Sequence, residues 1–106
     1  MLIGVSALSA EIGLFCHGST EELAVKKAIF GKRARDRIIV ADYTKIGSLD
    51  GFRFGEAQGL RANVSRCILV TDAPPADSPL EARERFEKQT QLLEMQGVIV
   101  KRVEAS

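Results

Sequence analysis

The sequence predicts an α/β domain built on a mostly parallel sheet with flanking helices. Two apolar runs, residues 37–42 and 66–72, are continuous and not alternating, which is typical of strands buried on both faces of a parallel sheet. Helix-forming segments separate the apolar runs, and such alternation is the pattern of α/β proteins. With 106 residues, the chain suffices for one compact domain and is too short for two ordinary ones.

The first half of the chain is predicted to begin with an extended segment and a helix. Residues 1–5 form an apolar run that ends at small residues, so we expect a strand there, and residues 13–16 are predicted to be a second brief extended piece. The sequence Ser19-Thr20-Glu21-Glu22 has the spacing of a capping box, which predicts a helix from Thr20 to about Ala34. The apolar face of this helix is predicted to contain Val25, Ala28 and Ile29.

The second half is predicted to contain a long loop followed by a strand, a helix and a strand. Residues 43–65 hold four of the nine glycines and little periodicity, so we expect a loop with at most a short element near residues 51–54. Ser78 before Pro79 is the favoured order of a helix cap and a first helical residue, and Gly97 is a natural stop. The elements predicted here are a strand over residues 66–72, a helix over 79–96 and a strand over 98–103.

Composition and charge exclude several classes of protein. Fifteen Lys and Arg against fourteen Asp and Glu give a net charge of +1, whereas domains that hold nucleic acid through phosphates usually carry a clear basic excess. No apolar stretch approaches the roughly 18 residues that cross a bilayer, and the amino end lacks the pattern of a signal peptide. The glycines lack the spacing of a dinucleotide fingerprint. We therefore expect a cytoplasmic protein with no membrane contact and no cofactor.

The two cysteines are predicted to be buried thiols. Cys16 and Cys67 lie far apart in the sequence, and disulfides are rare in cytoplasmic proteins. Together with His17 they could suggest a metal site, but the chain lacks the paired spacing of zinc ligands. Ordinary thiols and a loop imidazole are the favoured interpretation, with no metal.

Asp42 and Lys45 are the main candidate binding residues. They follow the strand predicted at residues 37–42, and ligands of parallel α/β sheets bind outside the carboxyl ends of the strands. A carboxylate can accept hydrogen bonds from sugar hydroxyls, and an ammonium can contact a phosphate. The alternative is a structural turn in which Asp42 caps loop amides and Lys45 is solvated.

Five stretches, taken in order, carry a family pattern. They are Leu2-Ile3-Gly4-Val5 with Leu8-Ser9-Ala10-Glu11-Ile12-Gly13-Leu14, then Glu22 to Ala28, Ile39-Val40-Ala41-Asp42-Tyr43-Thr44-Lys45-Ile46-Gly47, Leu69-Val70-Thr71-Asp72, and Gly97-Val98-Ile99-Val100. Together they resemble the C-terminal effector-sensing domain of the DeoR family of bacterial transcriptional repressors. The resemblance implies a Rossmann-like fold related to ribose-5-phosphate isomerases and CoA transferases.

The resemblance also implies a ligand, a phosphorylated sugar or related metabolite. Asp42 would hold its hydroxyls and Lys45 its anionic end, with Thr44 and Gly47 shaping the loop. Thr44 stands where the family usually has Ser, and Ser6 stands where it usually has Asp. Ser6 and Glu11 are also expected among the ligand-binding residues. The expected function is therefore a sensor module of a regulator and not an enzyme.

Two other functions stay open. A sugar-phosphate isomerase would need a general base near the substrate, and Glu11 is the candidate in the sequence. Alternatively, the chain is a truncated remnant that acts only through self-association, since Met1 falls in the middle of the family's sensor domain and the winged helix-turn-helix has no counterpart here. Residues 1–106 would then be a partial sensor domain.

Self-association is expected in each case. The first strand is predicted to expose an unpaired edge together with the apolar side chains of Leu2, Ile3 and Val5. A chain of this length tolerates such exposure poorly as a monomer. We expect a homo-oligomer, most simply a twofold dimer, with the first strand or the helix at residues 79–96 at the interface.

We expect no specific DNA binding by this chain alone. The charge is near neutral, no pair of short helices joined by a Gly-containing turn is apparent, and the basic cluster is predicted to be a solvated surface. Fluorescence anisotropy with labelled duplexes at physiological salt measures this, and sequence-specific binding would contradict it. The basic cluster consists of Lys26, Lys27, Lys32, Arg33, Arg35 and Arg37.

Overall fold

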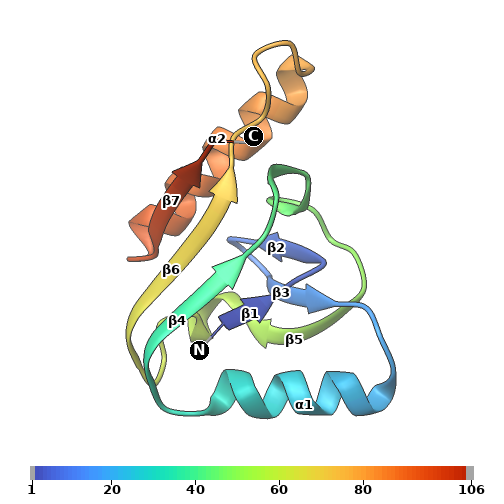
Figure 1. Cartoon of the computed structure of the whole chain (residues 1–106), viewed down its shortest axis with the longest axis vertical. Coiled ribbons are helices and arrows are strands. Elements are labelled where there is room, and N and C mark those ends of the chain that lie inside the picture. The colour runs from blue at the N-terminus through green and yellow to red at the C-terminus, as the bar shows by residue number, and fades with distance from the viewer. Residues whose placement is uncertain (1, 105–106) are drawn as a thin grey trace.

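The computed structural model describes residues 2–104 and contains two sheets and two helices (Figure 1). The larger sheet is parallel, with the spatial order β1 (Leu2–Gly4), β4 (Ala34–Val40), β6 (Val64–Asp72), β7 (Ile99–Val103). The smaller sheet is antiparallel, with the order β2 (Ala7–Ser9), β3 (Gly13–Cys16), β5 (Phe52–Glu56). The helices are α1 (Thr20–Gly31) and α2 (Leu80–Met95), and two 3₁₀ turns are η1 (Tyr43–Lys45) and η2 (Ala57–Gly59). The predicted α/β class with a mostly parallel sheet is confirmed.

The antiparallel sheet is absent from the prediction. Its strand β2 has three residues, all of them buried, and has no counterpart in the prediction, whereas β3 matches the extended piece predicted at residues 13–16 and β5 overlaps the short element predicted near residues 51–54. Strands β2 and β5 form because β3 stands between them and pairs with each. The pairing of β3 with β5 joins segments far apart in the sequence, which local sequence patterns do not reveal.

Helix α1 is shorter than predicted and faces the core differently. Ser19 caps it as expected, its Oγ accepting a hydrogen bond from the Glu22 N–H at 3.2 Å. The helix ends at Gly31 because β4 already begins at Ala34, in register with Val64. The predicted apolar face is wrong for Val25 and Ala28, which are exposed. The residues of α1 turned toward the protein are Leu23, Lys26, Ile29 and Phe30.

The start of α2 also differs from the prediction. The helix begins at Leu80, Pro79 is the residue at its N-cap, and that cap has no side-chain hydrogen bond. Ser78 therefore does not cap the helix. Its N–H instead donates to the Pro75 carbonyl at 2.9 Å, which closes a turn before the helix.

Arg37 is a buried arginine that hydrogen-bonds to backbone carbonyls outside its own strand. It is fully buried on β4 and not solvated, so its placement in the solvated basic cluster is wrong. Its guanidinium donates to the carbonyls of Gly59 at 2.8 Å, Leu60 at 2.5 Å and Phe30 at 2.5 Å, and lies 4.2 Å from the centre of the Phe30 ring. Burial lowers the pKa of Arg37. One side chain thus connects β4 to the end of α1 and to η2.

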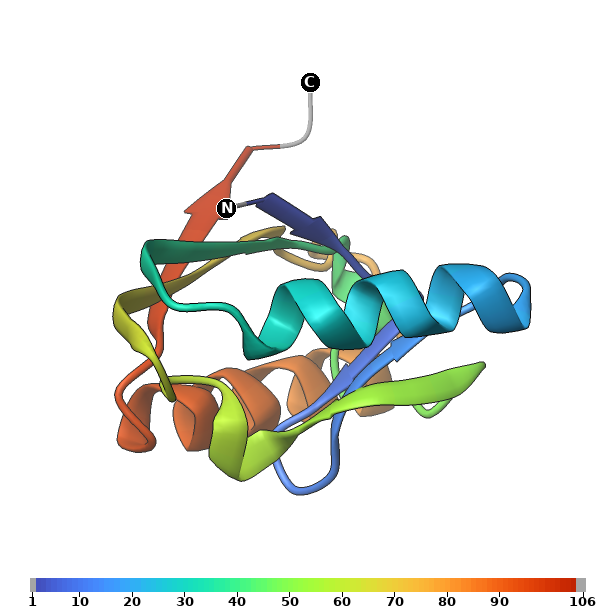
Figure 2. The same cartoon turned by 90° about the horizontal axis from the view of Figure 1, so that it is seen from below.

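The parallel sheet is covered on one face only. Figure 2 shows α1, α2 and the antiparallel sheet together on the same side of it. Right-handed crossovers that always advance in one direction across a sheet put every helix on one face. The prediction that both central strands are buried on both faces is therefore wrong for β4, where Val40 points to the uncovered side and is exposed, whereas Ile68 on the same side of β6 is buried. Ile99, on the edge strand β7, also points to the uncovered side and is exposed.

The first strand is also more buried than predicted. Ile3 and Val5 belong to the core, and only Leu2 is exposed, because neighbouring side chains of a strand point to opposite faces. Met1, part of the predicted strand, lies outside the described residues. Within residues 2–104, neither helix combines the length and apolarity needed to span a bilayer.

Replacing Arg37 with methionine should destabilise the chain strongly. Arg37→Met removes the guanidinium that donates to the buried Leu60 carbonyl and to the partly buried carbonyls of Gly59 and Phe30, and we expect the free energy of unfolding to fall by about 2–4 kcal/mol. Urea denaturation followed by circular dichroism measures the change. The matched control is Arg35→Met at an exposed position of the same strand, where we expect less than about 0.5 kcal/mol. Equal effects of the two substitutions would contradict the role given to Arg37.

Candidate functional site

Asp42, Thr44 and Lys45 form one compact group beyond the carboxyl end of β4. Asp42 is the N-cap residue of η1, and its carboxylate accepts hydrogen bonds from the Thr44 N–H at 3.0 Å and from the Thr44 hydroxyl. The Lys45 ammonium lies 3.2 Å from the second carboxylate oxygen. The side chains remain partly open to solvent, with 44% of Asp42 and 41% of Lys45 exposed. The structure therefore brings these three predicted residues together.

A second aspartate holds this turn in place. Asp72, at the end of β6, accepts a hydrogen bond from the Tyr43 N–H at 2.8 Å. Because β4 and β6 are parallel neighbours, their carboxyl ends meet at one edge of the sheet. The Asp42 turn is thus fixed to two strands, and Asp72 acts in the structure as its anchor.

Gly47 closes the loop against α2. Its N–H donates to the Leu8 carbonyl at 2.6 Å, and its φ of +82° lies in the left-handed region that favours glycine. A Cβ there would lie 2.7 Å from the Gln89 side chain and 2.8 Å from that of Arg85. Gly47 therefore allows a close approach of the loop to the helix.

Ser6 forms a hydrogen bond with the loop at Asp50, beyond Gly47. Its hydroxyl donates to the Asp50 carbonyl at 2.6 Å, and the Asp50 carboxylate lies 2.9 Å from the His17 Nε2. Ser6 follows β1, so it also belongs to the carboxyl side of the sheet. In this structure the hydroxyl is used to hold the loop.

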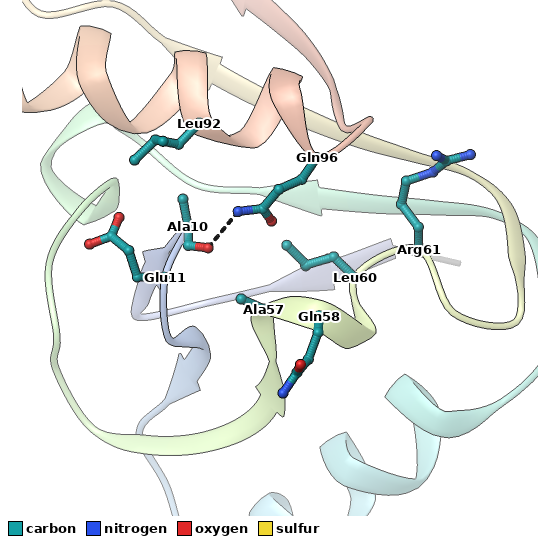
Figure 3. A pocket seen from close by; sticks show the side chains of 8 residues that line it. All are labelled: Ala10, Glu11, Ala57, Gln58, Leu60, Arg61, Leu92 and Gln96. Atoms are coloured by element: carbon teal, nitrogen blue, oxygen red, sulfur yellow. Dashed lines mark hydrogen bonds between the residues drawn. The ribbon is translucent and has the colours of Figure 1, made fainter.

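Glu11 is held by Gln89, the α2 residue that Gly47 approaches. Its carboxylate accepts a hydrogen bond from Gln89 on α2 at 2.7 Å, and the other amide atom of Gln89 accepts from the Ala10 N–H at 2.8 Å. Glu11 lines an open hollow of about 550 Å³ together with seven other residues, none of which belongs to the Asp42 turn (Figure 3). The hollow is lined by Ala10, Glu11, Ala57, Gln58, Leu60, Arg61, Leu92 and Gln96.

Gln89 of α2 and Gln96, the residue that caps the end of this helix, hold the chain segment at residues 10–11 beside this hollow. Gln96 donates to the Ala10 carbonyl at 2.7 Å, the bond drawn in Figure 3, and the buried Gln89 holds Glu11. Sequence analysis did not single out either residue. The available signal was helical spacing, since Gln89 shares the inward face of α2 with Phe86 and Leu93.

Hydrogen bonding lowers the pKa of the Asp42 carboxyl. The pKa of its carboxyl lies below the ordinary value of 3.8, mainly because Thr44 donates to it and also because Lys45 is adjacent, while partial burial opposes this. Asp42 is thus an anion at neutral pH. Its carboxylate would accept hydrogen bonds from a ligand and would not act as an acid.

The two cysteines are buried and free, as predicted. Burial raises the pKa of the Cys67 thiol, which keeps it protonated at neutral pH. Within residues 2–104, no three or more His, Cys, Asp or Glu side chains gather in a way that could hold a metal ion.

Comparisons with models of protein families, with curated proteins and with solved structures found no match to this chain. The resemblance to the DeoR family therefore stays a prediction. The geometry of the Asp42 turn, and not a relative, has to carry the functional argument.

The Asp42 turn should contribute pH-dependent stability. Because the pKa of Asp42 is lower in the folded chain than its ordinary value of 3.8, its stabilising effect is present above that value and is lost as pH falls through the folded pKa. We expect Asp42→Asn to lower the urea midpoint at pH 7, and the difference from the wild type to shrink in strong acid.

Urea titrations across this pH range test the expectation. Asp77→Asn, in the exposed turn before α2, is the matched control for the loss of a carboxylate. A difference between Asp42→Asn and the wild type that stays constant with pH would contradict the assignment.

Proposed function

We propose that this chain is the effector-binding module of a DeoR-like transcriptional regulator in the cytoplasm, and that it binds a phosphorylated sugar at the turn from Asp42 to Gly47. The observation that supports it is the position of this turn. An anion and a cation, both open to solvent, stand beyond the carboxyl end of a parallel strand, where ligands of α/β sheets bind. A Rossmann-like relationship to ribose-5-phosphate isomerases belongs to the same proposal.

The charges of the turn suit such a ligand. The Lys45–Asp42 ion pair is partly exposed, and exposed pairs contribute only about 0–1 kcal/mol. A phosphate group can therefore draw Lys45 away from Asp42 at little cost. The carboxylate oxygen that Lys45 leaves then accepts a hydrogen bond from a sugar hydroxyl, while Thr44 keeps the other oxygen in place.

The backbone of the turn is held before any ligand arrives. Asp72 fixes Tyr43 at one end, and Leu8 fixes Gly47 at the other. A turn fixed at both ends loses little conformational freedom on binding, which favours affinity for a small ligand. The proposal needs only the side chain of Lys45 to move.

Binding without turnover fits the position of Glu11. The isomerase alternative needs a general base within hydrogen-bond reach of the reacting carbon. Glu11 is instead hydrogen-bonded to Gln89 and lines a hollow to which no residue of the Asp42 turn contributes. We therefore favour a sensor over an isomerase.

Removing the Lys45 charge should weaken ligand binding. We expect ribose 5-phosphate to bind the wild-type chain, and Lys45→Met to weaken this binding by about tenfold or more because a charge-assisted contact to phosphate is lost. Isothermal titration calorimetry gives the affinity. Lys88→Met, at an exposed position of α2, is the matched control and should bind like the wild type.

Three outcomes would decide the proposal. No binding of ribose 5-phosphate or of inorganic phosphate at millimolar concentration would contradict a phosphorylated ligand. Equal losses in the Lys45 and Lys88 variants would contradict the site. Sustained conversion of ribose 5-phosphate to the ketose, abolished by Lys45→Met, would favour the enzyme.

A further inference from the structure

The uncovered face of the parallel sheet carries a continuous apolar row. Leu2, Ile38, Ile68 and Ile99 stand side by side across all four strands, each in register with the next. The next row toward the carboxyl edge contains Gly4, Val40, Val70 and Lys101 in the same register. We call these two rows the outer face.

The outer face exposes an unusual amount of apolar surface. Leu2 is 71% exposed, Val40 44% and Ile99 42%, while Ile38 and Val70 are half-buried and Ile68, at the centre of the first row, is 7% exposed. Parallel sheets are normally covered on both faces, and contiguous exposed apolar patches mark interaction sites. Both helices and the second sheet lie on the opposite side in Figure 2, so nothing in the described chain covers this face.

We infer that a second copy of this chain covers the outer face, with a twofold axis parallel to the strands between β4 and β6. This axis exchanges β4 with β6 and β1 with β7 across the interface. The apolar rows then meet each other: Ile38 lies over Ile68 of the second copy, and Val40 lies over Val70. At the periphery, Gly4 leaves room for the longer Lys101 side chain of the other copy.

The charges beside the apolar rows are complementary under the same axis. Asp36 and Arg66 are paired in register at the amino edge of the face, with the Arg66 Nη2 2.9 Å from the Asp36 Oδ2. The axis puts Asp36 of one copy over Arg66 of the other, and the reverse. Two ion pairs thus become one network of four alternating charges. A twofold axis perpendicular to the strands would instead put Asp36 of one copy over the carboxyl end of β4 in the other copy.

The size of the face sets the strength of the dimer. Four strands about 4.8 Å apart, each with about five residues at about 3.3 Å, cover roughly 300 Å² in plan. A tight interface buries about 800 Å² per partner. We therefore expect a reversible dimer that forms between about 10 µM and 1 mM, and not a permanent one.

Sedimentation equilibrium over this concentration range tests the dimer. Val40→Lys places a charge on the centre of the outer face, and we expect it to weaken the dimer about a hundredfold because two copies each bury an ammonium. Val25→Lys is the matched control, since Val25 is an exposed valine on α1 away from the face. Circular dichroism confirms that both variants are folded. A wild-type monomer at 1 mM, or equal effects of the two variants, would overturn the inference.

A charge exchange tests the direction of the axis. The double variant Asp36→Arg with Arg66→Asp restores both the pair within a copy and the pairs between copies, so it should dimerise with itself like the wild type. Mixed with the wild type, it meets like charges at both positions, and mixed dimers should form about tenfold less than pure ones. Native mass spectrometry of isotope-labelled wild type mixed with the unlabelled variant gives the fraction of mixed dimers. Mixed dimers in the statistical proportion would overturn this axis.

Discussion

The packing of Arg37 is the interaction on which the rest of this structure depends. The chain has to bury the end of α1 and the turn η2 next to each other, and both present backbone carbonyls without helical partners. One guanidinium on β4 reaches the carbonyls of Phe30, Gly59 and Leu60 and also lies over the Phe30 ring. A cation at the end of a helix is favourable as well. The parallel sheet, the helix and the antiparallel sheet are therefore joined at a single side chain.

The parallel arrangement of β4 and β6 decides which side chains meet at the carboxyl edge of the sheet. With β4 and β6 held as parallel neighbours, Asp42 and Asp72 arrive at the same edge from different parts of the chain. Asp72 is used to fix Tyr43, which leaves Asp42, Thr44 and Lys45 to form the outermost group. Asp72 binds the backbone of the turn at Tyr43 and Asp42 binds it at Thr44, which explains how an exposed turn stays ordered. It also explains why an ammonium and a carboxylate are presented together at a place suited to ligands.

The order of the strands decides what the two faces of the sheet can do. Because the chain advances from β1 to β4, β6 and β7 in one direction, all three crossovers cover the same face. That face becomes the core, with Ile39 and Leu69 fully buried. The opposite face keeps Leu2, Val40 and Ile99 exposed, and it is the surface through which we infer association. A binding turn at one edge and an association surface on one face can coexist, because they use different sides of the same strands.

The sequence by itself determined the parallel sheet, both helices within a few residues and the Asp42 turn, because these depend on signals that lie within a few positions of each other. The continuous apolar run at residues 66–72, the Ser19 cap and Gly97 after α2 are such local signals. Only the tertiary structure decided the pairing of β3 with β5, the burial of Arg37 and the hydrogen bond that holds Glu11. Most of these contacts join positions far apart in the sequence: Arg37 and Leu60 are separated by 23 positions and Gln89 and Glu11 by 78. The uncovered sheet face has the same origin: an apolar run looks alike whether one face or both are packed, and the direction in which the strands are added across the sheet makes the difference.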